Sequence, residues 1–181
     1  EVTDRKKLVE NTFFLPFRAV DGMAELYGRW AGAGAEFHFV SASPWQLYEP
    51  LAEFTHGAGF PPATFHLRRI RLKDSSVLSL LADPLAAKLS VIEPLMADFP
   101  QRKFVLVGDS GERDPEVYGT LAAKHPDQVL RIYIRDVTGD GADSTRYKTA
   151  FGQLPRDKWQ LFRDPKEIRE EERPGVGPAP Q

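Results

Sequence analysis

Cysteine is absent from this sequence of 181 residues, and no apolar run is long enough to cross a bilayer. Without cysteine there are no disulfides, no thiol catalysis and no cysteine-ligated zinc, which leaves carboxylates and histidines as metal ligands. The 4 histidines do not fall at metal-ligand spacings. A membrane helix needs about 20 consecutive apolar residues, and the first residues lack the basic-then-apolar order of a secretory signal. We therefore expect a cytoplasmic protein.

The chain also has no large excess of either charge, because its 24 basic and 26 acidic residues give a net charge of −2. This balance gives no reason to expect a nucleic-acid partner. The length fits one ordinary domain with a real core. We expect that domain to cover residues 1–171, and we expect the Pro/Gly-rich tail 172–181 to be disordered.

Apolar runs and helical spacings alternate along the chain, which favours a parallel α/β sheet of the Rossmann-like kind with helices on both faces. The run at residues 104–107 is continuous and partly β-branched, as in a strand buried on both faces. The predicted helices are 21–34, 45–59, 88–99 and 115–124, and the predicted strands are 36–41, 63–73, 103–108 and 128–137. A last strand and helix are expected near 159–171.

The polar turn after strand 103–108 reads "GDSGERDP" and lies where open parallel sheets place their ligands. Asp109 and Asp114 flank this turn, and two such carboxylates can hold Mg²⁺ directly or through water. Plainer interpretations exist for both, since Asp109 also suits a turn and Asp114 also suits the N-cap of the next helix. The cap and the metal role are compatible.

The stretch "FHFVSASPW" ends another predicted strand in small polar residues. Ser41 and the backbone amide of Ala42 are expected at the same edge of the sheet, directed at an anion. Ser43, which precedes Pro44, is better interpreted as a cap of the following helix.

Lys88 stands before or in the first turn of the helix that leads into strand 103–108. A lysine at such a place usually lies on a solvated surface. Here it precedes a strand whose end gathers acids, so a buried ammonium between phosphate and carboxylate is the alternative. Arg113, in the polar turn, either steers phosphate or pairs with Glu112 or Glu116.

These stretches together resemble the haloacid dehalogenase superfamily of phosphotransferases. "GDSGERDPEVY" and "FVSASPW", with residues 11–27 and 132–137, resemble more closely the lipin-related, actin-patch type of phosphatidate phosphatase catalytic domain, from about residue 4 to residue 168. The resemblance implies the fold, a Mg²⁺ cofactor and phosphomonoester hydrolysis.

The resemblance also implies roles for individual residues. Ser41 and Lys88 would bind the transferring phosphoryl group, Asp109 would ligate Mg²⁺, and Asp114 would support that metal site. One departure stands out, because the family's nucleophile lies in a D-x-D-D-T signature on the central first strand, and no such motif occurs in this sequence. We expect that strand shortly before Glu1, and we expect the chain without it to be inactive.

The substrate implied by the resemblance is phosphatidate or a related phosphomonoester, with peripheral membrane contact as a further expectation. The stretch "HLRRIRLK" offers four bases that could meet an anionic headgroup or form a solvated strand edge. Two other interpretations remain open, namely a phosphatase of soluble phosphates and a non-catalytic anion- or lipid-binding module.

Overall fold

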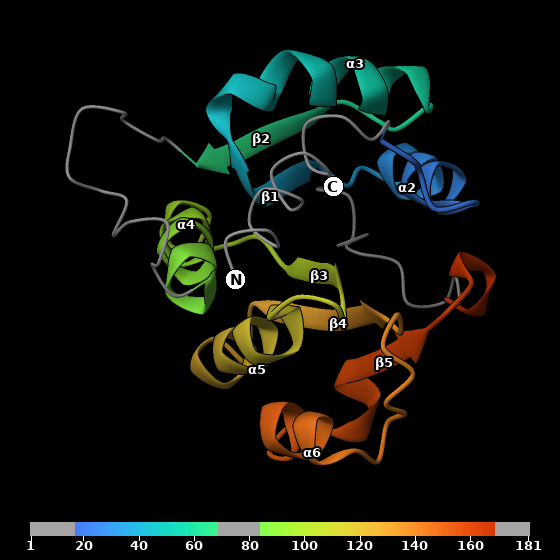
Figure 1. Ribbon diagram of the computed structural model, residues 1–181. Helices are drawn as coiled ribbons and strands as arrows, with labels where there is room; N and C mark the ends of the chain where they lie inside the picture. The colour runs from blue at the N-terminus through green and yellow to red at the C-terminus, as the bar shows by residue number, and fades with distance from the viewer. Residues whose placement is uncertain (1–16, 69–83, 169–181) are drawn as a thin grey trace, which may run out of the picture.

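The computed structural model describes residues 17–68 and 84–168, which form a parallel α/β fold (Figure 1). The helices are α2 (Met23–Gly32), α3 (Tyr48–Gly57), α4 (Pro84–Asp98), α5 (Asp114–Lys124) and α6 (Thr145–Phe151). The strands are β1 (Phe37–Pro44), β2 (Ala63–Arg68), β3 (Phe104–Asp109), β4 (Val129–Arg135) and β5 (Trp159–Phe162). Short 3₁₀ turns are η1 (Trp45–Leu47), η3 (Arg156–Lys158) and η4 (Pro165–Glu167).

The strands form two parallel sheets, one of β1 and β2 and one in the order β3-β4-β5. Within the described ranges β1 and β3 do not pair with each other. Figure 1 shows the strands following one another as β2, β1, β3, β4 and β5. The edges of β1 and β3 therefore lie where the two sheets meet.

Both faces of the β3-β4-β5 sheet are covered, as the sequence predicts. Ile132 and Ile134 of β4 pack with α4, α5 and α6, whereas Tyr133 between them packs with α2 on the other face. This alternation follows from the two-residue period of a strand. The parallel α/β fold with helices on both faces is thus confirmed.

The two sheets also share their hydrophobic core. One cluster of buried residues includes Leu26 of α2. Phe37 and Phe39 of β1 pack against this cluster, and so do Val105 and Val107 of β3. On the other face Val40 of β1 joins the cluster of α4, α5 and α6. The sheets are therefore held side by side by side-chain packing, while the backbone edges of β1 and β3 do not bond to each other.

Several predicted boundaries shift. Helix α4 begins at Pro84 rather than at Lys88, so Lys88 lies inside the helix. Strand β1 extends to Pro44, and predicted helix 45–59 divides into η1 and α3. Proline fits the first turn of a helix, where its missing N–H is not needed, which accounts for Pro84 and for Pro50 near the start of α3.

Helix α6 was not predicted, because it lies in a stretch that reads as a variable loop. The expected strand near 159 is present, but the helix after it is only the turn η4. Residues 69–73 of the predicted strand 63–73 and the tail 172–181 lie outside the described residues. None of the described helices has the length and apolarity that a membrane crossing requires.

Candidate functional site

The turn between β3 and α5 begins at Asp109, the last residue of β3. The Asp109 Oδ1 atom accepts a hydrogen bond from the Gly111 amide at 2.7 Å, which closes the turn. Asp109 is half-buried, and its other carboxylate oxygen has no hydrogen bond among the described residues. The turn-forming role expected for Asp109 is therefore present, and one oxygen remains available.

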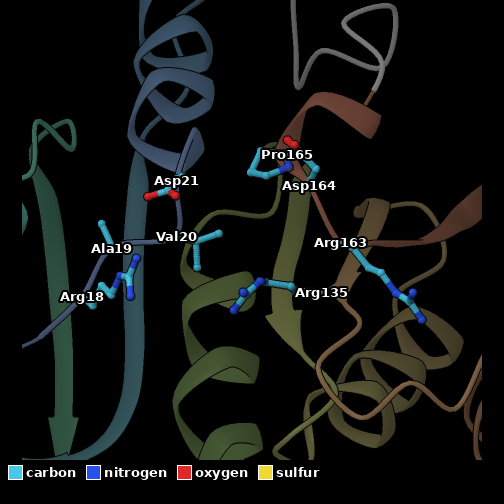
Figure 2. A pocket seen from close by; sticks show the side chains of 8 residues that line it. All are labelled: Arg18, Ala19, Val20, Asp21, Arg135, Arg163, Asp164 and Pro165. Carbon is cyan, nitrogen blue, oxygen red and sulfur yellow. The ribbon is translucent and has the colours of Figure 1, made fainter.

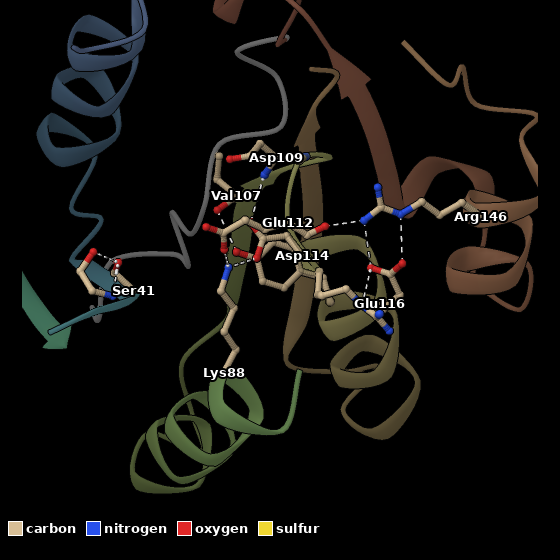
Figure 3. A network of polar contacts seen from close by, with 12 residues as sticks. Ser41, Lys88, Val107, Asp109, Glu112, Asp114, Glu116 and Arg146 are labelled. Carbon is tan, nitrogen blue, oxygen red and sulfur yellow. Dashed lines mark hydrogen bonds and ion pairs between the residues drawn. The ribbon is translucent and has the colours of Figure 1, made fainter. Parts of the chain in front are cut away.

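Asp114 begins α5 and is almost fully buried, with 5% of its surface exposed. Its carboxylate accepts the Asp109 amide at 3.1 Å and the ammonium of Lys88 (Figure 3). The prediction that Asp114 is the N-cap was wrong, because Arg113 holds that position and Asp114 caps no amide of its own helix. Its side chain turns back toward β3 instead, and a Cβ on Gly108 would overlap it.

Lys88 reaches this turn from α4 and is itself buried, with 8% exposed. Its Nζ donates to Asp114 and, at 2.7 Å, to Glu112. Of the two alternatives for Lys88, the solvated surface position is therefore wrong, and the buried ammonium beside carboxylates is confirmed, while its contact with a phosphate stays a prediction. The pair joins α4 to α5 across the end of β3.

The electrostatics of this pair follow from its burial. Burial raises the pKa of the Asp114 carboxyl above its usual value, while the Lys88 ammonium opposes that rise. Burial alone would lower the pKa of Lys88, but the carboxylates of Asp114 and Glu112 raise it overall. Lys88 is thus a fixed positive charge at neutral pH, linked to the backbone of Asp109 through the shared carboxylate of Asp114.

Arg146 of α6 holds the turn from the other side, and sequence reasoning missed it. Its guanidinium donates to the Glu116 carboxylate at 3.0 and 3.2 Å and to the carbonyls of Ser110 and Glu112. Glu116 and Arg146 are 30 positions apart, so no local sequence pattern predicts their contact. The Ser144 N-cap, which accepts the Tyr147 amide, was the signal that could have placed α6.

Ser110 anchors the turn to the loop after β4 and was also missed. It is 1% exposed, and its hydroxyl oxygen lies within hydrogen-bond distance of the Val137 and Thr138 amides, at 2.9 and 3.0 Å. With Arg146, this contact fixes the backbone of the turn on two sides.

Ser41 lies in β1, where the pairing with β2 is interrupted between Val40 and Pro44. Its hydroxyl donates to Ser43 Oγ at 3.0 Å and accepts the Ser43 amide at 3.1 Å. Ser43 caps no helix, contrary to the prediction, because β1 continues through it and Pro44 precedes η1. Exposed Ala42 lies between the two serines.

The structure brings only some of the predicted residues together. Lys88, Asp109 and Asp114 form one network, whereas Ser41 is drawn apart from it on the neighbouring sheet (Figure 3). Ser41 and Asp109 both lie toward the carboxyl ends of their parallel strands, so they share an edge of the fold. Arg113 pairs with Glu116 at 3.7 Å, as one alternative predicted, and its side chain is 54% exposed.

Direct coordination of a metal by both aspartates does not fit this arrangement. Both oxygens of Asp114 are used, one by Lys88 and one by the Asp109 amide. In the described parts of the chain no three His, Asp or Glu side chains gather as a metal site. Asp109 has one carboxylate oxygen without a hydrogen bond to a described residue, whereas both oxygens of Asp114 already have partners, and the metal roles of the two residues stay a prediction.

Comparison with known proteins identifies the family of this chain and two of its relatives. Residues 1–136 match the family described as phosphatidate phosphatase APP1, catalytic domain. The chain is 34% identical over 139 residues to the uncharacterized protein C29B5.04c of Schizosaccharomyces pombe, covering 75% of this chain and 22% of that protein. It is 33% identical over 143 residues to phosphatidate phosphatase APP1 of Saccharomyces cerevisiae, covering 77% of this chain and 24% of that protein.

The chain thus spans less than a quarter of the length of these two relatives. No solved structure matches it. The family match covers the edge of the fold that carries Ser41, Lys88, Asp109 and Asp114. The chain belongs to the APP1-type phosphatidate phosphatase catalytic domain family.

Proposed function

We propose that this chain is part of a Mg²⁺-dependent phosphatase that hydrolyses phosphatidate. The family match and the name of the yeast relative support a phosphatidate phosphatase. The observation that carries the proposal is the buried ammonium of Lys88, held beside Asp109 at the end of a parallel strand. A fixed positive charge at this edge suits a phosphoryl group.

The residues take the following roles in this proposal. Lys88 offsets the charge of the phosphoryl oxygens, and the Ser41 hydroxyl and the Ala42 amide bind those oxygens from the neighbouring sheet. Asp109 supplies one oxygen ligand to Mg²⁺, and Asp114 supports it by holding the turn. Arg113 steers the anionic substrate from the exposed rim. Bound Mg²⁺ would supply charge neutralisation for the phosphoryl oxygens.

The nucleophile in this proposal is an aspartate on a strand encoded before Glu1. Among the described residues nothing pairs with the facing edges of β1 and β3, which meet through side-chain packing, and this supports a strand between them. Its carboxylate attacks phosphorus, and the bond to the lipid oxygen breaks as a second acid donates a proton to that oxygen. Water then attacks the aspartyl phosphate and releases phosphate. The chain without this strand would be inactive.

Contact with a membrane surface belongs to the same proposal, for a protein that works from the cytoplasm. Trp45 and Tyr48 follow the carboxyl end of β1, are 53% and 39% exposed, and stack with ring centroids 5.1 Å apart. Arg68 is the register partner of Pro44, the residue before Trp45, so a basic residue lies at the same end of the sheet. Aromatic rings with a polar tip beside a base suit the interface of an anionic bilayer.

The experiment that tests the proposal uses the chain extended upstream to include its native preceding strand. Phosphate release is measured from dioctanoyl phosphatidate, glycerol 3-phosphate and a nucleotide, with Mg²⁺ or with EDTA. The expected result is Mg²⁺-dependent release that favours phosphatidate. Release from the soluble substrates alone would indicate a phosphatase of soluble phosphates, and no release from any substrate would indicate a binding module.

Flotation with vesicles containing phosphatidate tests the membrane contact separately. Trp45→Ser should reduce flotation, whereas Phe99→Ser, at a 42% exposed apolar position after α4, is the matched control. Equal flotation of the two variants would argue against the Trp45 surface.

A further inference from the structure

A hollow of about 440 Å³ lies beside the candidate site, between the segment before α2 and the ends of β4 and β5 (Figure 2). Its walls are formed by Arg18, Ala19, Val20, Asp21, Arg135, Arg163, Asp164 and Pro165. Arg135 is the last residue of β4 and the register partner of Asp109 in β3. The hollow therefore opens next to the predicted metal ligand, yet it contains none of the predicted catalytic residues.

Two of the charged lining side chains already have partners elsewhere. Arg163 binds the buried carboxylate of Asp136 at 3.0 Å and points away from Arg135 in Figure 2. The Asp164 carboxylate accepts the Lys166 amide and caps η4, and Pro165 is apolar. The charge in the hollow is thus left to Arg18, Arg135 and Asp21.

Arg18 and Arg135 have no hydrogen bond or ion pair with any described residue, although their guanidinium groups cannot lose their charge. Arg135 is half-buried, and Figure 2 shows it extending from β4 toward the segment that carries Arg18 and Val20. A half-buried cation that no described carboxylate contacts is costly. A planar guanidinium recovers that cost best by binding a phosphate or carboxylate in two-point fashion.

We propose that Arg18 and Arg135 form an oxyanion subsite that binds a phosphate-class group beside the candidate active site. The two guanidinium groups approach from different elements, the segment before α2 and the end of β4, so they can contact different oxygens of one tetrahedral anion. Asp21 on the same wall offsets one positive charge, which suits a single phosphate group rather than a polyphosphate. The subsite goes beyond the proposed hydrolysis, because its binding needs neither Ser41, Lys88 nor a nucleophile.

The group could come from inorganic phosphate or from the headgroup of a lipid. NMR of the arginine Nε–Hε groups distinguishes these sources in the full chain, with the Arg135 and Arg18 signals assigned through Arg135→Gln and Arg18→Gln. Each sample is titrated with inorganic phosphate and, separately, with dihexanoyl phosphatidate below its micelle concentration. Shifts of both signals with both ligands indicate the oxyanion alone, and shifts only with phosphatidate indicate the lipid headgroup.

The matched control is Arg102→Gln, which removes a 60% exposed arginine just before β3, at the other end of the sheet. We expect Arg18→Gln and Arg135→Gln each to weaken binding about tenfold, or about 1.4 kcal/mol, and Arg102→Gln to leave it unchanged. Because Arg18 is exposed, its loss should not disturb folding, and unchanged thermal melting would verify this. Unshifted arginine signals with both ligands, or equal affinity in Arg18→Gln and Arg102→Gln, would overturn the subsite even if phosphatase activity is present.

Discussion

Lys88 and Asp114, 26 positions apart in the chain, form a buried ion pair that ties α4 to the start of α5. The side chains are only 9% and 7% exposed, so neither charge is satisfied by water. The Asp109 amide completes the network by donating to the second carboxylate oxygen of Asp114. The position of Asp109, the predicted metal ligand, thus depends on the ion pair of Lys88 and Asp114.

Removing the ammonium tests this dependence. Lys88→Met should lower the free energy of unfolding by about 3 to 5 kcal/mol, because it leaves the Asp114 carboxylate buried without its counter-charge. The double variant Lys88→Met/Asp114→Asn should recover part of that loss. Equilibrium unfolding in urea measures both. A double variant whose loss equals the sum of the two single losses would show that the residues do not interact.

Glycine at position 108 is required by the same network. A Cβ there would overlap the Asp114 carboxylate, so Gly108→Ala must displace Asp114 from Lys88 and lower the melting temperature. Gly28→Ala in α2 is the matched control, since no atom lies within 4 Å of its Cβ position. That exposed helical position should instead gain about 0.5 to 1 kcal/mol. A Gly108→Ala variant as stable as the wild type would refute the close contact.

Arg146 should act on the turn after β3 rather than on substrate. Arg146→Gln removes the donors to the Ser110 and Glu112 carbonyls, so the amides of residues 110–113 should exchange with deuterium faster. Lys148→Gln, at an exposed position on the same helix, should leave their exchange unchanged. Mass spectrometry measures these exchange rates. Equal protection of residues 110–113 in both variants would show that Arg146 does not hold the turn.

His38 and His66 predict a pH dependence of stability. Their Nδ1 and Nε2 atoms lie 3.0 Å apart between β1 and β2, so one ring must be a neutral acceptor. Burial and then the neighbouring His66 lower the pKa of His38, and Glu36 only partly opposes them. The unfolded chain therefore binds the proton more readily, and stability should fall as the pH drops below about 6.5, the unperturbed value.

Urea unfolding at pH 8 and pH 5.5 measures this loss. The variant His38→Gln should lose less stability between the two pH values than the wild type does. An equal loss in both proteins would assign the pH dependence to other groups.

The sequence predicted the features that depend on local pattern. The continuous apolar run at 104–107 placed β3, and Asp109 followed from the polar turn after it. Lys88 was predicted near the acidic turn after β3 because its helix leads directly into that strand. These predictions succeed because each depends on residues that are neighbours in the chain.

The sequence could not predict contacts that depend on distant pairing. Ser110 and Arg146 meet across 36 positions, and Arg146 stands in a short helix whose polar surroundings resemble a loop. Asp114 suits an N-cap in sequence, but the lysine from α4 draws its carboxylate toward β3. Tertiary contacts decide which partner such a side chain takes, and a local capping propensity carries no information about those contacts.

The most direct test of the central claim is a crystal structure of the upstream-extended protein with Mg²⁺ and orthovanadate. We predict one vanadate that contacts Ser41 Oγ and Lys88 Nζ, with the metal on a carboxylate oxygen of Asp109. A vanadate bound elsewhere, with Ser41 and Lys88 too far apart to share one anion, would contradict it.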